Sequence, residues 1–107
     1  PLKKALATAS AWISGIRKDQ TAIRAQSEII QLTNEGVVKI CPMLDWTGEE
    51  IRNYVAQNHL PTHPLLNQGF LSIGCAPCTR PASAQDHERA GRWLGLQKVE
   101  CGLHTEI

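Results

Sequence analysis

The sequence has almost no excess charge of either sign, few aromatic residues and no long apolar run. Eleven Lys and Arg side chains stand against ten Asp and Glu, which leaves a net charge of +1. Without a strong overall field, the composition does not favour binding to nucleic acid or to a membrane surface, and any anion site must be local. No stretch approaches the roughly 20 apolar residues of a spanning helix, and no signal-type apolar core follows Pro1–Lys4. We therefore expect a soluble, cytoplasmic protein.

The chain has room for one domain core at most, with 107 residues of which 42% are hydrophobic. Because it begins at a proline rather than at a methionine, we expect a piece of a longer protein. The patterns of the first half predict a short helix over Leu2–Ala7, a strand over Trp12–Ile16 whose polar continuation Gly15–Gln20 reaches a sheet edge, and a hairpin of Ile29–Leu32 and Val37–Ile40.

The clearest helix signal of the second half lies at Thr47–Glu50, which has the form of a capping box. Trp46 and Ile51 are placed to form the accompanying hydrophobic staple, and the helix is expected to end at Asn58–Pro61. The proline, glycine and cysteine content from Pro61 to Pro81 then predicts loops and short turns. A further helical segment is expected over His87–Leu94.

The four cysteines leave several kinds of chemistry open. An even number permits two disulfides, although nothing else in the sequence favours secretion. Cys75 and Cys78 form a C-x2-C pair in a turn, a spacing that lets two sulfurs converge on one metal centre but that two reduced thiols would also satisfy. Cys101 and His104 add a C-x2-H pair, so spacing permits a Cys3His zinc site in an interaction module. Cys101 is equally a candidate nucleophile, with His104, Arg89 and Arg92 favouring its thiolate.

Several basic side chains could bind phosphate or sulfate, because guanidinium groups match those oxygens well. The alternative is a solvated basic face, which is excluded only if the side chains converge. The candidates are Arg17, Lys18, Arg24, Arg80, Arg89 and Arg92.

The order of several segments resembles that of the assimilatory sulfonucleotide reductases. Trp12–Gln20 with Arg24 resembles the segment W-x-x-G-x-R-[RK]-x-Q-x-x-x-R of that family, and Glu100–His104 resembles its Glu-Cys-Gly-Leu-His ending. The remaining matching segments lie between these two in the family's order, so the resemblance covers nearly the whole chain. They are Lys39–Trp46, the region of His63–Leu65, Gly69–Arg80 and Arg89–Trp93.

The resemblance implies roles for individual residues. Cys101 would be the catalytic cysteine, and Cys75 and Cys78 would be two of the four ligands of a [4Fe-4S] cluster, with the other two expected upstream of Pro1. The phosphosulfate would be bound by Arg24, Arg89, Arg92 and His104, with Arg17 as a further member. Cys41 would be a small buried side chain rather than a replacement ligand.

The implied fold is α/β, the C-terminal part of a parallel sheet of the adenine-nucleotide α-hydrolase (PP-loop) type, without the half that carries the phosphate loop. Within it, residues 1–60 would supply the last strands and helices, 61–94 the cluster loop and arginine segment, and 95–107 the mobile catalytic tail. The implied activity is reduction of adenylyl sulfate to sulfite and AMP through an S-sulfocysteine, with thioredoxin or a similar dithiol as reductant. The 3′-phosphorylated nucleotide is the alternative substrate, a homo-oligomer is possible, and the fragment alone is expected to be inactive.

Overall fold

The computed structural model describes residues 2–101, and their contacts divide the chain into two compact units. The sheet unit contains the residues up to Ile51 together with Glu100 and Cys101, and the loop unit runs from Arg52 to Val99. The chain therefore leaves the sheet unit inside a helix and returns to it at Glu100. Among residues 2–101, no helix is both long enough and apolar enough to cross a membrane.

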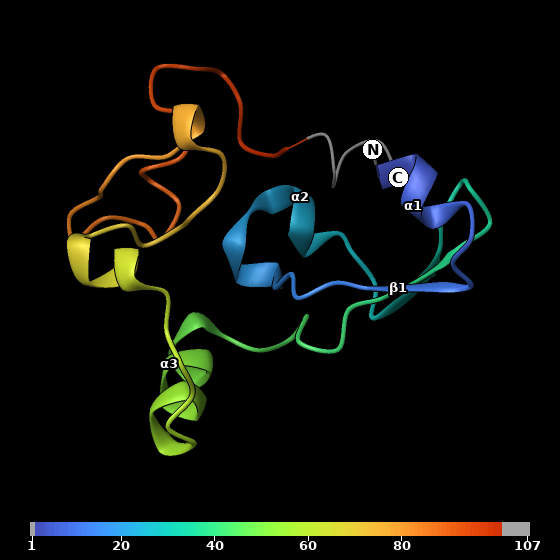
Figure 1. The fold of residues 1–107 in the computed structure, drawn as a ribbon, viewed down its shortest axis with the longest axis horizontal. Helices are drawn as coiled ribbons and strands as arrows, with labels where there is room; N and C mark the ends of the chain where they lie inside the picture. The colour runs from blue at the N-terminus through green and yellow to red at the C-terminus, as the bar shows by residue number, and fades with distance from the viewer. Residues whose placement is uncertain (1, 102–107) are drawn as a thin grey trace. The chain divides into compact units, whose positions relative to one another are not determined.

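The sheet unit is an α/β arrangement around a mixed sheet of three short strands in the order β1-β3-β2. The strands are β1 (Ala11–Ile13), β2 (Ile30–Leu32) and β3 (Val38–Ile40). β3 pairs in parallel with β1 and antiparallel with β2 (Figure 1). Gly36 turns the β2–β3 connection with φ of 77°, a conformation that suits glycine. The predicted hairpin is confirmed, and the predicted first strand is present in a shorter form.

The two faces of this sheet differ from the usual division into an apolar inner face and a polar outer face. Ile13, Ile40 and Ile30 lie opposite one another across the three strands. Ile13 and Ile30 are nevertheless 71% and 64% exposed. The alternate face carries Trp12 opposite Lys39, which is only 4% exposed and whose ammonium lies 5.0 Å from the indole centroid. The buried face is thus closed by a cation–π pair, while the apolar face remains uncovered.

A small core lies where β1 and β3 end. Ile16, Cys41 and Leu44 are at most 4% exposed and pack as one cluster. Main-chain hydrogen bonds continue the strand pairing into this region, from Ser14 N to Ile40 O (2.9 Å) and from Lys18 N to Leu44 O (2.8 Å). The prediction that Cys41 is a buried small side chain is confirmed.

Three helices and one 3-10 turn complete this unit. The predicted first helix is confirmed as α1 (Leu2–Leu6). η1 (Lys18–Gln20) and α2 (Ala22–Ala25) were not predicted, because the charged segment after β1 was interpreted as a strand end. The missed signal is Thr21, an N-cap residue whose hydroxyl accepts a hydrogen bond from Arg24 N (3.2 Å).

The third helix, α3 (Gly48–Gln57), begins at the predicted capping box and carries the chain into the loop unit. The Thr47 hydroxyl accepts from Glu50 N (3.2 Å), and the Glu50 carboxylate accepts in return from Thr47 N (2.7 Å). Asp19 adds a second cap by accepting from Gly48 N (2.7 Å). The helix ends before His59, which adopts φ of 50°.

The loop unit has little regular structure beyond the end of α3, as predicted. It contains η2 (Pro64–Gln68) and η3 (Ala76–Cys78). The predicted helix over His87–Leu94 is wrong. Two successive turns replace it, because Arg92 forms an antiparallel bridge with Thr79 and Trp93 adopts φ of 50°, which a continuous helix excludes.

Candidate functional site

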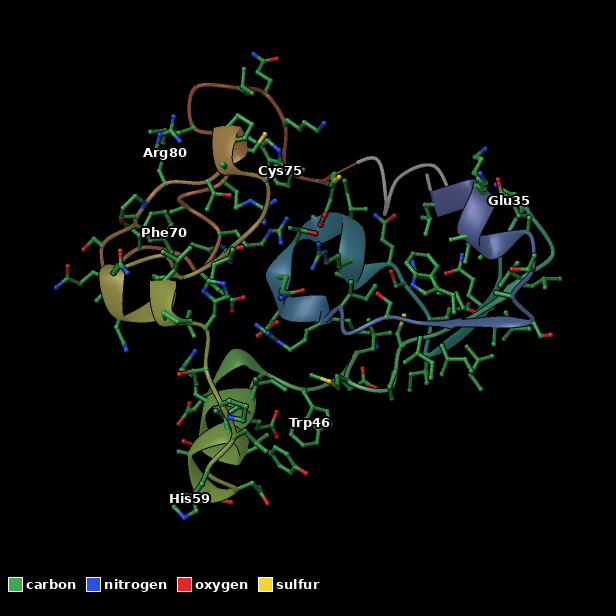
Figure 2. The ribbon with its side chains drawn as sticks, in the orientation of Figure 1. Glu35, Trp46, His59, Phe70, Cys75 and Arg80 are labelled. Atoms are coloured by element: carbon green, nitrogen blue, oxygen red, sulfur yellow. The ribbon has the colours of Figure 1, made fainter. Side chains whose placement is uncertain are left out.

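The Cys75–Cys78 turn of the loop unit is held by several hydrogen bonds. Cys78 N donates to Cys75 O (2.9 Å), closing the turn on itself. The buried Thr79 hydroxyl donates to Cys75 O (2.9 Å) and accepts from Gly74 N (3.1 Å). Both cysteines are free thiols, and Cys78 is half-buried. Cys75 is exposed (Figure 2). Thr79 was not among the predicted site residues, although a Thr directly after a C-x2-C pair can stabilise the turn by hydrogen bonds from its hydroxyl to the main chain.

The Gly91–Trp93 segment is hydrogen-bonded to this turn and to the residues that follow it. Arg80 N donates to Gly91 O (2.8 Å), and Trp93 N donates to Cys78 O (3.1 Å). The approach at Gly91 is so close that a Cβ there would lie 2.1 Å from Arg80 O. Only glycine allows this contact, so the turn and the arginine segment are fixed to each other by their backbones.

An apolar hollow of about 410 Å³ borders the turn. Its lining includes Leu65, Phe70 and Ile73, with Arg80 at its polar side. The turn therefore offers two thiols on a rigid backbone beside apolar surroundings. Among residues 2–101, no group of three or more His, Cys, Asp or Glu side chains is arranged to hold a metal ion.

Arg89 and Arg92 both pack against Trp93 in the loop unit. Their guanidinium carbons lie 5.4 and 4.5 Å from the Trp93 ring centroid. Arg92 Nη1 donates weakly to Ser72 Oγ and to Ile73 O, each at 3.3 Å. The Arg92 guanidinium also lies close to Gly74, because a Cβ at Gly74 would be only 2.3 Å from Arg92 Nη2. The structure thus brings Arg92 against the segment that leads into the cysteine turn.

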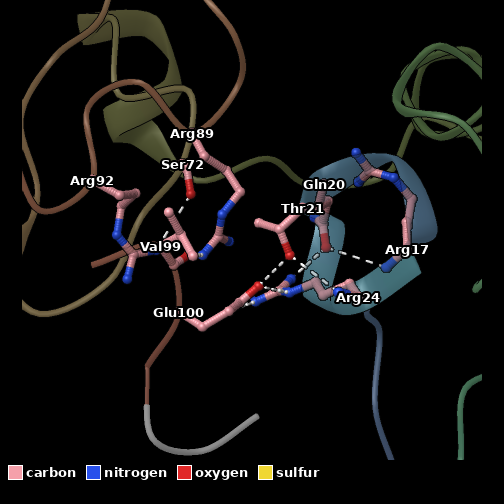
Figure 3. A network of polar contacts seen from close by, with 9 residues as sticks. All are labelled: Arg17, Gln20, Thr21, Arg24, Ser72, Arg89, Arg92, Val99 and Glu100. Carbon is pink, nitrogen blue, oxygen red and sulfur yellow. Dashed lines mark hydrogen bonds and ion pairs between the residues drawn. The ribbon is translucent and has the colours of Figure 1, made fainter. Parts of the chain in front are cut away.

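Glu100 and Arg24 form a buried ion pair in the sheet unit. Arg24 Nε donates to Glu100 Oε1 (2.7 Å) and Nη2 donates to Oε2 (2.9 Å). The side chains of Arg24 and Glu100 are only 9% and 1% exposed. The Thr21 hydroxyl donates to the same carboxylate (2.6 Å), and Arg24 Nη1 donates to Gln20 Oε1 (Figure 3). The sequence indicated Glu100 only as the first residue of the Glu-Cys-Gly-Leu-His motif. Its partner lies 76 residues away, so no local pattern indicates the pair.

The remaining candidates of the sheet unit have contrasting surroundings. Cys101 directly follows the ion pair and is exposed. Arg17 is buried, and its Nε donates to Asp19 (2.9 Å). Burial raises the pKa of the Cys41 thiol, an effect that the nearby Lys39 charge opposes only in part, so Cys41 is a poor nucleophile. His104 lies outside the described residues.

Comparison with known proteins places these features in a family context. Residues 1–81 match the family described as "Phosphoadenosine phosphosulfate reductase domain". The chain is similar to the "Adenosine 5'-phosphosulfate reductase" of Lysinibacillus sphaericus, with 45% identity over 97% of this chain and 45% of the relative. It is 46% identical to "Adenosine 5'-phosphosulfate reductase 1" of Bacillus subtilis over 97% of this chain and 45% of that relative. A relative of the same name from Rhodococcus erythropolis is 46% identical over 98% of this chain and 43% of its own length. The chain thus spans somewhat less than half the length of these relatives.

Proposed function

The chain belongs to the phosphoadenosine phosphosulfate reductase domain family, and from this membership we propose that it is the thiol-bearing part of an enzyme that reduces adenylyl sulfate to sulfite and AMP. The observation that carries the proposal is the exposed thiol of Cys101, fixed directly after a buried ion pair, in a chain 44–46% identical to proteins named adenosine 5'-phosphosulfate reductase. This activity would make the protein an oxidoreductase of sulfate assimilation.

In the proposed reaction, the Cys101 thiolate attacks the sulfur of adenylyl sulfate. The bond between that sulfur and the bridging oxygen breaks, AMP leaves with the bonding electron pair, and S-sulfocysteine remains on the protein. A thiolate of thioredoxin or of a similar dithiol then attacks the Cys101 sulfur and releases sulfite. The second thiol of that protein resolves the mixed disulfide, so the dithiol supplies both electrons. An exposed thiol suits this role because it must meet two partners in turn.

We propose that the phosphosulfate is bound by Arg89, Arg92 and His104, with charge from Arg17, and that Arg24, the remaining candidate, supports the site indirectly. Arg92 supports this proposal best, since its buried Nε has no hydrogen-bond partner among residues 2–101 and its Nη1 hydrogen bonds are long, at 3.3 Å each. A guanidinium held against Trp93 and the cysteine turn is preorganised for an oxyanion whose charge moves to the leaving phosphate. Arg17 is engaged with Asp19, so it would act mainly through its charge. Arg24 is engaged with Glu100, so it would support the site through that ion pair rather than through contact with the anion.

The donor chemistry of the Cys75–Cys78 turn fits an iron–sulfur centre in part. Two thiols on one hydrogen-bonded turn are suitable ligands, and we propose that both hold a [4Fe-4S] cluster whose other two ligands come from outside this chain. The bound cluster would supply structural support and local electrostatics rather than electrons. Thr79 and Gly91 make contacts that fix the turn whose two cysteines would hold the cluster.

The parent fold is proposed to be the adenine-nucleotide α-hydrolase type, whose sheets are covered by helices on both faces. The exposed apolar face of Ile13 and Ile30 supports this proposal, because it is suited to burial under further elements of a larger protein. The proposal includes a cytoplasmic enzyme that works with a dithiol partner, as a monomer or a homo-oligomer.

The decisive experiment compares Cys101→Ser and Cys75→Ser in the full-length protein. Cys101→Ser should abolish sulfite formation and leave the visible charge-transfer spectrum intact, whereas Cys75→Ser should remove that spectrum. Loss of the spectrum in Cys101→Ser would make Cys101 a ligand and overturn its role as nucleophile. Zinc in place of iron would favour the interaction module.

The phosphorylated nucleotide is the second candidate substrate, because the family description names it. The names of the similar proteins and the cysteine pair both favour the unphosphorylated one. Sulfite release from each nucleotide by the full-length protein, at matched concentrations, distinguishes them.

A further inference from the structure

The carboxylate of Glu100 lies in a preformed socket of three donors. Arg24 contributes two of them, at 2.7 and 2.9 Å, and the Thr21 hydroxyl contributes the third, at 2.6 Å. Both carboxylate oxygens are thus engaged, and the Glu100 side chain is 1% exposed. A charged group so thoroughly buried and bonded holds its backbone in one place, because moving it would leave the arginine buried and unpaired.

The socket itself is fixed by the short helix α2. Thr21 accepts from Arg24 N (3.2 Å) with the same hydroxyl that donates to Glu100, so the helix cap orients that hydroxyl. Gln20 accepts from Arg24 Nη1, which fixes the other side of the guanidinium. All three guanidinium nitrogens therefore have protein partners, and Arg24 is only 8% exposed. In this arrangement Arg24 is turned toward Glu100 rather than toward solvent.

The position of Glu100 in the chain gives the pair its significance. Glu100 is the first residue of the sheet unit after the whole of the loop unit, Arg52–Val99. Cys101 follows at once, and consecutive Cα atoms are only about 3.8 Å apart. The ion pair therefore fixes the backbone position from which the exposed side chain of Cys101 extends.

We propose that Glu100, held by Arg24 and Thr21, is the positioning residue of the Cys101 nucleophile, so that Arg24 serves the reaction through Glu100 rather than by binding the substrate anion. This inference rests on the proposed function of Cys101. It predicts that loss of the pair slows sulfur transfer to Cys101 and leaves nucleotide affinity unchanged.

The first test measures single-turnover formation of S-sulfocysteine on Cys101 by mass spectrometry in the full-length protein. Glu100→Gln keeps the shape but removes the charge, and transfer should slow by about 10- to 100-fold, since a displacement of about 1 Å can cost about a hundredfold. Affinity for AMP should not change. Glu28→Gln, at an exposed carboxylate of the same unit, is the matched control and should transfer sulfur at the original rate. Glu100→Asp, which keeps the charge, should recover part of the lost rate.

The second test separates action through Glu100 from direct binding by Arg24. Arg24→Gln and the double variant Arg24→Gln/Glu100→Gln should lose no more activity than Glu100→Gln alone, because all three break one pair. The proposal would be overturned if the activity loss of the double variant equalled the product of the two single losses, or if Arg24→Gln alone weakened AMP binding. Either result would mean that Arg24 contacts the nucleotide.

Amide hydrogen exchange at Cys101 gives a readout independent of turnover. Exchange should be faster in Glu100→Gln than in Glu28→Gln. Thr21→Val removes one donor without breaking the ion pair and should give a smaller effect in the same direction, which keeps the test usable if Glu100→Gln fails to fold. If amide exchange at Cys101 is faster but the protein does not act on adenylyl sulfate, the proposed function is overturned, whereas the positioning of Cys101 by Glu100 is supported. Unchanged amide exchange together with unchanged sulfur transfer would overturn that positioning.

Discussion

At the scale of single residues, the space around the backbone decides whether a glycine position can accept a side chain. Gly15 and Gly91 belong to different units and differ sharply in their surroundings. A Cβ at Gly15 would meet no atom of the described residues within 4 Å, whereas a Cβ at Gly91 would lie 2.1 Å from Arg80 O. The second position leaves no room for any side chain, because the obstacle is backbone and cannot rotate away.

Gly91→Ala should therefore destabilise the protein, and Gly15→Ala should not. We expect a cost of about 1–3 kcal/mol in the free energy of unfolding for Gly91→Ala, as for overpacked sites, together with a disturbed Cys75–Cys78 turn. Gly15→Ala should stay within about 0.5 kcal/mol of the original protein. Urea unfolding of the two variants, side by side, measures the difference. Equal stability of both would mean that the Arg80–Gly91 contact is not formed in solution.

Residue properties with local causes were predictable, and those with distant causes were not. The burial of Cys41 follows from its place after a β-branched strand. The engagement of Arg24 depends on Glu100, and the support of Cys75 depends on the Thr79 hydroxyl and on Gly91 across a bridge. Such contacts are set by tertiary packing, which a sequence pattern does not specify.

At the scale of elements, the start of α3 shows how a local signal becomes structure. Thr47 and Glu50 exchange hydrogen bonds as the capping box requires. The Glu50 carboxylate accepts from Thr47 N and from the Thr47 hydroxyl, and these two bonds lower its pKa below its usual range. The false helix over His87–Leu94 has comparable apolar spacing but no such cap. Its segment instead pairs with Thr79, so tertiary contacts overrode the helical pattern.

The cap should make the first turn of α3 sensitive to acid. Because the folded pKa of Glu50 is lowered, the cap contributes its full stability above the carboxyl's unfolded pKa and loses it as pH falls through the folded pKa. The Thr47 amide chemical shift, followed by NMR from pH 7 down to pH 2, should titrate with a midpoint below that of an unstructured glutamate. Thr47→Ala should move this midpoint back up. A Glu50 midpoint unchanged by Thr47→Ala would contradict the capping assignment.

At the scale of the whole molecule, the part of the chain that the structure describes leaves apolar side chains exposed and cysteines unbridged. Ile30 and Leu32 on strand β2 are 64% and 69% exposed. Cys75 and Cys78 are two free cysteines, and the proposed [4Fe-4S] cluster would require four ligands. Both observations point to completion by further parts of a larger protein.

Residues 1–107 made alone should therefore fail to hold a full cluster and should self-associate. Anaerobic reconstitution with iron and sulfide should give fewer than about four irons per chain, against about four in the full-length protein. Light scattering should detect oligomers that Ile30→Lys reduces, because that change breaks the apolar face. Four irons per chain with retained activity would show that the ligand set lies within these residues and would refute the proposed upstream ligands.

The loop unit is an insertion whose two ends are tied to one body, since the chain leaves the sheet unit after Ile51 and rejoins it at Glu100. The segment between Ile51 and Glu100, which carries Cys75 and Cys78, could therefore change in length or sequence without displacing Cys101, provided that the Arg24–Glu100 ion pair is kept. The Arg24–Glu100 ion pair, rather than the segment between Ile51 and Glu100, would then be the fixed part of this architecture.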